Sequence, residues 1–178
     1  KSLIINLKSE KGQNIIKDLA KKADILVENF KVGNLAKFGL DYKSLSEINP
    51  KLIYASVTGF GQTGPRSSEP GYDAALQGMT GIMSVTGEPD GRPTKVGVAW
   101  IDILTGLNAT IGILGALNER NTSGLGQHID VSLFDVGIAS MGYLAQNYLA
   151  TGVSATRIGN AHPQVAPYQD FEASNGNF

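Results

Sequence analysis

The chain has 178 residues, 42% of them apolar, which is enough for one ordinary domain with a hydrophobic core. The formal net charge of −1 argues against a nucleic-acid partner, because such partners require clustered Lys and Arg. Without cysteine there are no disulfides, cysteine metal sites or thiol nucleophiles, and His128 and His162 cannot form a histidine metal cluster unaided. We therefore expect a soluble globular protein without a metal site.

The first sixty residues alternate between strand and helix patterns. Residues 2–7 are a short apolar, β-favouring run that predicts a strand, and Ser9 is the predicted N-cap of the helix that follows. Residues 24–30 predict a buried strand, and residues 51–60 predict a third strand. This order of elements favours an α/β fold with a parallel sheet.

Two short helices are predicted between the second and third strands. The first covers residues 34–40 and is ended by Gly39, and the second covers residues 43–50. Ser44 and Glu47 have the spacing of a capping box, which supports a helix start at Ser44.

The second half of the sequence has a different character. Residues 59–71 are rich in Gly, Pro and Ser and predict a loop at the carboxyl end of a strand, where ligands bind in open α/β sheets. Residues 72–84 predict a helix. Two longer helices are predicted at about 101–118 and 131–150.

These patterns predict an α/β part over residues 1–66 and a helical and linker part over residues 67–178. The most apolar run, residues 96–117, is interrupted by Asp102, Asn108 and glycines, so a buried core helix is favoured over a membrane span. The sequence opens on a predicted strand without Met and ends at a turn signal. We therefore expect a fragment of a longer polypeptide.

Asp135 has an unusual place in the predicted helix over residues 131–150. At a helical spacing it shares one face with apolar and small residues, namely Val131, Ile138, Gly142, Ala145 and Leu149. Burying an unpaired carboxylate costs on the order of several kcal/mol, so such a group is usually paired, protonated or functional. The alternative is an acidic residue that is stabilised by the helix macrodipole. Asp130 is explained more simply as the N-cap.

The other candidates each have a structural explanation beside the functional one. The glycine-rich residues 58–65 lack the P-loop Lys and the G-x-G-x-x-G spacing, so they are a weak nucleotide motif and equally a flexible connection. Tyr72 and Asp73 stand at a predicted helix start, where Asp73 can be a plain cap. Asn29 follows a strand end and either contacts a ligand or marks a routine loop exit. His162 is a lone loop histidine that we expect to be solvated.

Three segments, taken together, resemble the class III CoA-transferase superfamily. They are "ADILVENFKVGNLAKFGLDYKSLSEINPKLIYASVTGFGQTGP", "PGYDAALQGMTGIMSVTG" and "SGLGQHIDVSLFD". The superfamily includes formyl-CoA, carnitine and succinyl-CoA:dicarboxylate CoA-transferases and the α-methylacyl-CoA racemases. The resemblance covers nearly the whole chain in collinear order. The segment "GNAHPQVAPYQDF" is most similar to transferases that act on small dicarboxylates.

The resemblance implies a Rossmann-like large domain with a parallel sheet and flanking helices. It also implies an interlaced homodimer, in which each chain forms an open ring through which its partner threads. This chain would be the middle portion of such a subunit. We expect a cytoplasmic protein without membrane contact, or one of the mitochondrial matrix if the source is eukaryotic.

The resemblance assigns covalent chemistry to Asp135. In the formyl-CoA transferase type, an Asp at this position attacks the acyl-CoA thioester and forms a mixed anhydride. CoA thiolate then forms an enzyme-bound thioester, and a second carboxylic acid takes the CoA. A partly desolvated carboxylate suits this role, because poor hydration makes it a better nucleophile. Some relatives carry the acidic residue five positions earlier, which makes Asp130 the alternative.

The substrates implied by the resemblance are an acyl-CoA and a small carboxylic acid, with no tightly bound cofactor. Asn29, Phe30 and Gly33 would line the CoA site. Gly59, Phe60 and Gly61, assigned to the same site, would let CoA approach the backbone closely. Tyr72 and Asp73 would lie near the reacting acyl group.

Two alternatives to CoA transfer remain open. Racemases carry a His where Tyr72 stands, and a tyrosine, with an ordinary pKa of about 10, is poorly suited to act as a base at neutral pH. Tyr72 therefore favours CoA transfer over racemisation. An inactive CoA-binding module is the second alternative.

Overall fold

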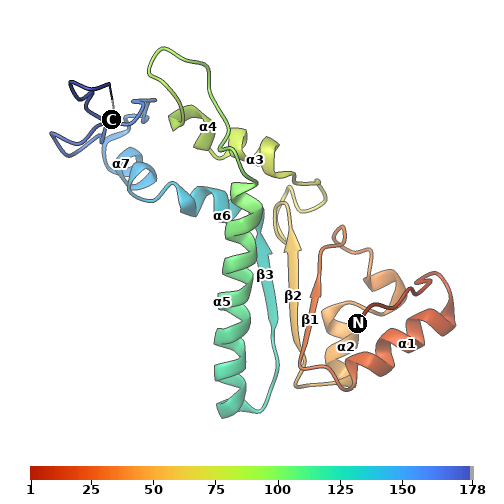
Figure 1. The fold of residues 1–178 in the computed structure, drawn as a ribbon. Helices are drawn as coiled ribbons and strands as arrows, with labels where there is room; N and C mark the ends of the chain where they lie inside the picture. Colours follow the sequence, from red (N-terminus) through yellow and green to blue (C-terminus); the bar gives the residue numbers. More distant parts are fainter. Residues whose placement is uncertain (177–178) are drawn as a thin grey trace.

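The computed structural model describes residues 1–176 and contains a parallel sheet with helices on both of its faces (Figure 1). The strands are β1 (Ile25–Glu28), β2 (Ile53–Thr58) and β3 (His128–Ser132), in the order β1-β2-β3. Both pairings are parallel. The predicted α/β class with a parallel sheet and flanking helices is confirmed.

One face of the sheet is covered by α1 (Glu10–Ala20), the 3-10 helix η1 (Ala36–Phe38) and α2 (Tyr42–Ile48). Apolar side chains of these segments and of β2 are buried against one another, and they include Ala20, Leu35, Leu40, Leu45, Leu52 and Tyr54. This burial is the main favourable contribution to the stability of this half of the chain.

Local signals at the helix starts were only partly predictive. Ser9 caps α1 as predicted, because its Oγ accepts a hydrogen bond from Gly12 N at 3.1 Å. The predicted capping box at Ser44 is wrong: the N-cap of α2 is Asp41, and Ser44 Oγ donates to Asp41 Oδ1 at 2.6 Å. The strand predicted over residues 2–7 is also wrong. Residues 1–6 form no regular structure, and the chain then turns toward α1. Asn6 Oδ1 stabilises this turn by accepting a hydrogen bond from Lys8 N at 3.0 Å.

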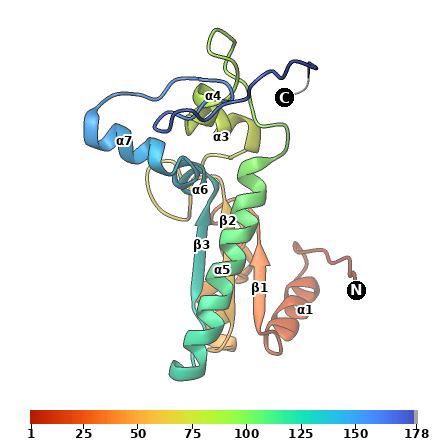
Figure 2. The same ribbon diagram turned by 60° about the vertical axis from the view of Figure 1, so that its left-hand side comes forward.

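The opposite face of the sheet is covered by the long helix α5 (Trp100–Ser123), which runs along β2 and β3 (Figure 2). α5 is long and apolar enough to cross a membrane by length and composition, and only 22% of its most apolar window is buried. One face of α5 packs on the sheet, and the other exposes Ile103, Leu107, Ile111 and Leu114. The prediction of a buried core helix therefore holds for one face only.

Arg120 ties the far end of α5 to the strands. Its Nη2 lies 2.9 Å from Asp24 Oδ1, and its Nη1 donates to Lys51 O at 2.9 Å. These two residues come immediately or shortly before β1 and β2. The contacts therefore hold α5 at the amino end of the sheet.

The single helix predicted over residues 131–150 is wrong. Its first two residues belong to β3, which is followed by α6 (Leu133–Ser140) and α7 (Tyr143–Thr151). Ile129 and Val131 pack against α5, and such β-branched side chains favour a strand. Gly142, between α6 and α7, has φ +53°, a conformation that L side chains rarely adopt.

Short helices cover the carboxyl ends of the strands. The helix predicted over residues 72–84 is split into α3 (Asp73–Met79) and α4 (Ile82–Val85), with Gly81 between them at φ +92°. α3, α4, α5 and α6 share a core that contains Leu76, Ile82, Ile101 and Leu133. α7 and the residues after it extend away from the sheet (Figures 1 and 2).

His128 gives the fold a pH-dependent contribution to stability. Its Nε2 lies 2.9 Å from Ser56 Oγ, and its ring stacks on Tyr42 with the ring centroids 5.0 Å apart. Burial lowers the pKa of His128 below its usual value, against the opposing charges of Asp130 and Glu28. The folded chain therefore binds this proton less readily than the unfolded chain. The contribution of His128 to the unfolding free energy is therefore complete above the pKa of the unfolded chain, about 6.5, and falls as the pH drops below that value.

We therefore expect His128→Gln to weaken the dependence of the unfolding free energy on pH. The measurement is urea unfolding of both proteins at several values between about pH 7 and pH 5. The wild type should lose more stability across this range than the variant. Equal slopes for the two proteins would contradict a buried neutral His128.

Candidate active site

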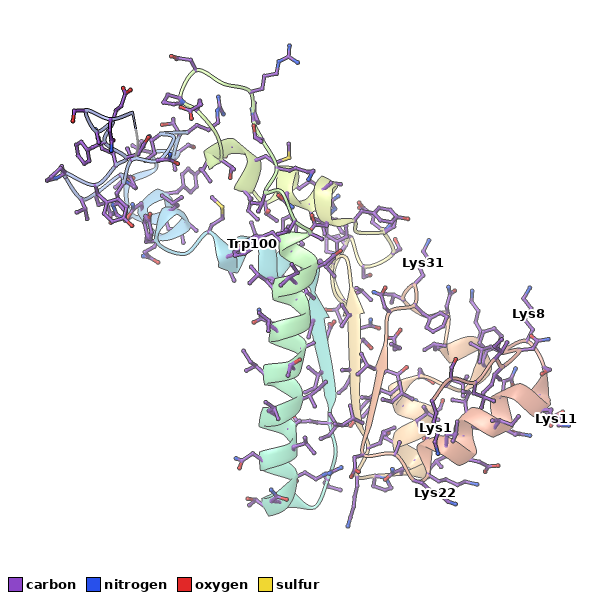
Figure 3. The ribbon with its side chains drawn as sticks, in the orientation of Figure 1. Lys1, Lys8, Lys11, Lys22, Lys31 and Trp100 are labelled. Atoms are coloured by element: carbon purple, nitrogen blue, oxygen red, sulfur yellow. The ribbon has the colours of Figure 1, made fainter. Side chains whose placement is uncertain are left out.

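Segments that follow the three strands meet at the carboxyl end of the sheet. Asn29 follows β1, Gly59 follows β2, and α6 with Asp135 follows β3. In open α/β sheets, ligands bind outside the carboxyl ends of the strands. Figure 3 shows Lys31 beyond the end of β1 and Trp100 at the start of α5, both near this edge. The structure thus gathers predicted site residues from separate segments.

Two cavities open at this edge, with Asn29, Gly59, Gly71 and Tyr72 in the lining of both. The first has a volume of about 260 Å³, and its other lining residues include Phe30, Lys31, Val32, Thr58, Ser67 and Glu69. The second has a volume of about 370 Å³, and its other lining residues include Val57, Asp73, Asp102, Thr105 and Leu133. The two cavities are therefore two lobes of one site, and they meet at residues predicted to contact CoA and the acyl group.

Asn29 is held in place by the neighbouring strand. Its Nδ2 donates a hydrogen bond to Val57 O, which lies near the end of β2. Tyr72, in contrast, is 72% exposed beside the shared part of the two cavities. Asn29 is therefore a fixed wall of the site, and the Tyr72 ring is accessible to a ligand.

The loop after β2 begins and ends at one close contact between backbones. A Cβ added to Gly59 would lie 2.4 Å from Gly71 N and 2.6 Å from Gly71 Cα. Only glycine permits this approach. We expected Gly59 to admit a ligand close to the backbone, whereas the structure shows that it admits the chain's own backbone at Gly71.

The glycine loop, defined here as residues 59–66, packs on the start of α6. The rings of Phe60 and Phe134 lie with their centroids 5.6 Å apart, and the Arg66 guanidinium lies 4.2 Å from the centre of the Phe60 ring. Arg66 also forms an ion pair with Glu69 at 2.7 Å. Phe60, predicted to line the CoA site, is thus in contact with α6 and outside the lining of both cavities.

Asp130 is not the N-cap that the sequence predicted. It lies on β3, and its Oδ2 accepts a hydrogen bond from Gln62 N at 2.9 Å. A Cβ on Gly61, which has φ +82°, would be 3.4 Å from the same oxygen. The Asp130 carboxylate is therefore hydrogen-bonded to the glycine loop. The N-cap of α6 is Ser132.

Asp135 stands in the first turn of α6 and is exposed, so the predicted burial of its carboxylate is wrong. The reason is that α6 buries the face with Leu133 and Val136, whereas Ile138, predicted on the same face as Asp135, is exposed as well. The position lies outside the lining of both cavities but next to the glycine loop. Ser132 Oγ accepts a hydrogen bond from Asp135 N at 3.2 Å and donates to Gly59 O at 3.4 Å. A negative charge in the first turn also complements the macrodipole of α6.

Asp73 caps a helix other than its own. Its Oδ2 accepts hydrogen bonds from Ile101 N at 2.8 Å and Asp102 N at 3.2 Å, at the start of α5. Its Oδ1 accepts one from Gln77 Nε2 at 2.6 Å. The pKa of Asp102 is raised, first by burial and then by the charge of Asp73. The prediction that Asp73 caps its own helix is wrong, because the N-cap of α3 is Tyr72 and the Asp73 carboxylate binds α5 instead.

We expect Asp73→Ala to lower the unfolding free energy by about 1–2 kcal/mol, because two backbone N–H groups of α5 lose their acceptor. Urea unfolding measures this loss. Asp73→Asn keeps one acceptor oxygen and should lie between Asp73→Ala and the wild type. An alanine variant as stable as the wild type would contradict the cap.

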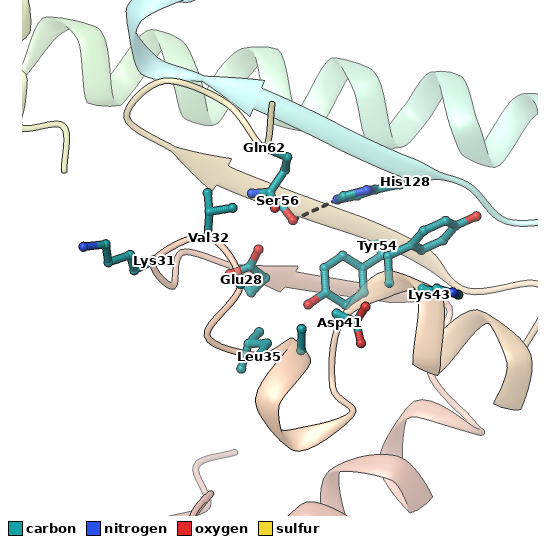
Figure 4. Close-up of a pocket in the computed structure, with 13 residues that line it drawn as sticks. Glu28, Lys31, Val32, Leu35, Asp41, Lys43, Tyr54, Ser56, Gln62 and His128 are labelled. Atoms are coloured by element: carbon teal, nitrogen blue, oxygen red, sulfur yellow. Dashed lines mark hydrogen bonds between the residues drawn. The ribbon is translucent and has the colours of Figure 1, made fainter. Parts of the chain in front are cut away.

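A third cavity, of about 320 Å³, lies on the face of the sheet that carries α2 (Figure 4). Gly33, predicted to line the CoA site, is found here, together with Lys31, which the third cavity shares with the first. Figure 4 shows Ser56 hydrogen-bonded to His128 and Gln62 beside them.

Two buried polar atoms near these cavities have no hydrogen-bond partner within residues 1–176. They are Gln62 Nε2 and Thr58 Oγ1. Sequence reasoning missed both residues. A usable signal was the recurrence of polar residues at Ser56 and Thr58 in an otherwise apolar strand, since alternate positions share one face.

Two other predictions concern residues outside this site. His162, expected to be solvated, packs between the rings of Tyr143 and Tyr168, with centroids 5.6 Å and 5.1 Å away. Within the described part of the chain, no group of three His, Asp or Glu residues could hold a metal ion.

Residues 1–178 of the chain match the family model described as "CoA-transferase family III". The chain belongs to CoA-transferase family III. The predicted resemblance to the class III superfamily is thereby confirmed. This family III chain also has curated relatives and a solved structural neighbour that match it over almost its whole length.

The family III chain is 49% identical over 176 residues to the succinate–glutarate CoA-transferase of Agrobacterium fabrum, covering 99% of this chain and 44% of that protein. It is 45% identical over 178 residues to the acetyl-CoA:oxalate CoA-transferase of Acetobacter aceti, covering 99% and 46%. A crystal structure of a CAIB/BAIF family protein from Brucella suis matches with a TM-score of 0.91 and 51% identity, covering 99% and 47%. The chain therefore spans slightly less than half the length of these relatives.

Proposed function

We propose that the complete protein transfers CoA from an acyl-CoA donor to a small dicarboxylic acid. The observation that carries the proposal is the 49% identity, over 99% of this chain, to an enzyme named for succinate and glutarate. A second relative is named for oxalate, another dicarboxylic acid. The cavities at the carboxyl ends of the strands support this proposal, since ligands of open α/β sheets bind there.

We assign the nucleophile to Asp135. Its carboxylate accepts no hydrogen bond from residues 1–176 and is exposed, so it is accessible to a thioester. The Asp130 carboxylate, by contrast, already accepts the hydrogen bond of Gln62 N. Ser132 fixes the backbone of Asp135 and contacts the glycine loop at the same time. These contacts favour Asp135 over Asp130.

The proposed reaction requires no net proton transfer. The Asp135 carboxylate attacks the thioester carbonyl and the C–S bond breaks. This step forms a mixed anhydride between Asp135 and the acyl group and releases CoA thiolate. The thiolate then attacks the aspartyl carbonyl and releases the donor acid as a carboxylate. The acceptor carboxylate attacks the resulting aspartyl thioester and expels the thiolate, which finally takes the acceptor's acyl group. Asp135 is regenerated, and one difficult exchange is divided into easier steps.

We place the acyl-CoA in the paired cavities. Asn29 and Phe30 line the first cavity, and Gly33 lies next to it in the third. Lys31 lines both of these cavities, and its ammonium can pair with the CoA phosphates. Tyr72, exposed where the two lobes meet, would contact the acyl group. The interlaced homodimer and the cytoplasmic location stay predictions.

The test is an acceptor screen with the complete polypeptide. We expect CoA to move from succinyl-CoA to glutarate or oxalate and less readily to a monocarboxylate such as butyrate. Mass spectrometry after incubation with acyl-CoA, or hydroxylamine trapping, should find the adduct on Asp135. Incorporation of deuterium at the α-carbon of a 2-methylacyl-CoA without an acceptor acid would instead indicate a racemase. CoA binding without an adduct or turnover would indicate an inactive binding module.

A further inference from the structure

Asp130 and Ser132 attach the glycine loop to β3 at two separate points. They are alternate residues, so both side chains lie on the same face of the strand. Asp130 Oδ2 accepts the hydrogen bond of Gln62 N at 2.9 Å, and Ser132 Oγ donates to Gly59 O at 3.4 Å. Gly59 O also accepts a hydrogen bond from Phe134 N at 3.0 Å. The base of the loop, at Gly59, is thus held by hydrogen bonds from Ser132 and Phe134. Further along the loop, Gln62 is held by its hydrogen bond to Asp130.

The register of the sheet shows what the Asp130 contact does. Thr58, at the end of β2, pairs with Ser132, whereas Asp130 pairs with Ser56, two residues further back along the strand. Gln62 therefore meets Asp130 only because the loop folds back over the sheet. This reversal includes Gly61 at φ +82°, a conformation that favours glycine.

The reversal also places Gln62 at the third cavity. Its side chain lies beside Ser56 and His128 in Figure 4, and its Nε2 is buried without a partner within residues 1–176. A buried amide without a partner is costly, so the loop needs a specific contact to stay in this position. A hydrogen bond to a carboxylate is stronger than one between neutral groups.

We propose that Asp130 is a positioning residue of the CoA site, whose carboxylate holds the glycine loop in the conformation that receives the acyl-CoA. This inference rests on the proposed function, in which Asp135 performs the chemistry. The two roles are separable, because the cap of Asp135 is Ser132 and not Asp130. Loss of the Asp130 carboxylate frees the loop at Gly61 and Gln62 but leaves the backbone of Asp135 in place.

The first test compares two substitutions of Asp130 in the complete polypeptide. Asp130→Ala removes the acceptor, and we expect the KM for acyl-CoA to rise by about tenfold while kcat changes by less than about twofold. Asp130→Asn keeps an oxygen that can accept the hydrogen bond of Gln62 N. Its KM should therefore stay within about threefold of the wild type.

The second test disturbs the same contact from the loop side. A Cβ at Gly61 would be strained by the positive φ and would crowd Asp130 Oδ2. We expect Gly61→Ala to raise the KM for acyl-CoA as Asp130→Ala does. The double variant should be no worse than the poorer single variant, because both changes break one interaction.

Four results would overturn the proposal. A loss of kcat in Asp130→Asn would make Asp130 a participant in the chemistry. An unchanged KM in Asp130→Ala would make the contact a surface hydrogen bond without influence on binding. Equal changes in KM and kcat together with a lower Tm would reduce Asp130 to a structural role. Additive effects of the two substitutions would show that they do not act through one contact.

Failure of the proposed function can be told apart from failure of this inference. If the wild type transfers CoA to no acid, the proposed function fails. The positioning role is then measured by titration calorimetry with CoA. We expect the Kd to rise in Asp130→Ala and to stay near the wild-type value in Asp130→Asn. An unchanged Kd in Asp130→Ala would overturn the positioning role as well.

Discussion

Asp135→Asn in the complete polypeptide is expected to lower kcat for CoA transfer by about a thousandfold or more. An amide has almost the same shape as the carboxylate but is a very poor nucleophile toward a thioester, so neither anhydride nor aspartyl thioester can form. The side chain is exposed, and its cap by Ser132 uses the backbone N. We therefore expect the Tm and the affinity for CoA to stay near the wild-type values.

The matched control for this substitution is Asp90→Asn. Asp90 is an exposed aspartate in the turn after α4, outside both the glycine loop and the β3–α6 segment. It loses the same charge, so kcat should be unchanged. Substantial activity in Asp135→Asn would exclude this residue as the nucleophile. A collapse of its Tm would show a structural role in its place.

Gly59→Ala is expected to have the largest effect on stability, a loss of about 2–4 kcal/mol. The added methyl group would lie 2.4 Å from Gly71 N and 2.6 Å from Gly71 Cα. Both contacts are to backbone, so no side chain can rotate away, and the two ends of the loop have to separate. Because Gly59 and Gly71 line both lobes of the site, the KM for acyl-CoA should rise as well.

Gly115→Ala is the control for this substitution. Gly115 lies in α5, and a Cβ there would meet no atom within 4 Å. Alanine favours a helix interior by up to about 1 kcal/mol, so this variant should equal or exceed the wild type in stability. Urea unfolding and Tm measure both variants. A wild-type Tm for Gly59→Ala would mean that the loop can shift at the end of β2 without cost.

The sequence predicted those elements whose signals are local. The N-cap at Ser9 and the apolar runs of β1 and β2 lie within a few residues of the structure that they predict. β3 was missed because the apolar spacing of the following helix fits back to Val131. The alternation of Ile129 and Val131 with polar neighbours is a strand pattern, and it was the better guide there.

The sequence predicted where in the fold the site lies, but it did not predict the hydrogen bonds that build the site. Residues after β1 and β2 were expected at one edge of the sheet, since the ends of parallel strands meet there. The acceptors for Gln62 N and Ile101 N are Asp130 and Asp73, which are 68 and 28 residues away in sequence. Contacts of this kind arise from tertiary packing and leave no local signature.

The attachment of α5 at both of its ends restricts how this chain can move. Asp73 binds the first turn of α5, and Arg120 binds Asp24 and the Lys51 carbonyl at the opposite end of the sheet. We therefore expect α5 and the sheet to move together as one rigid body.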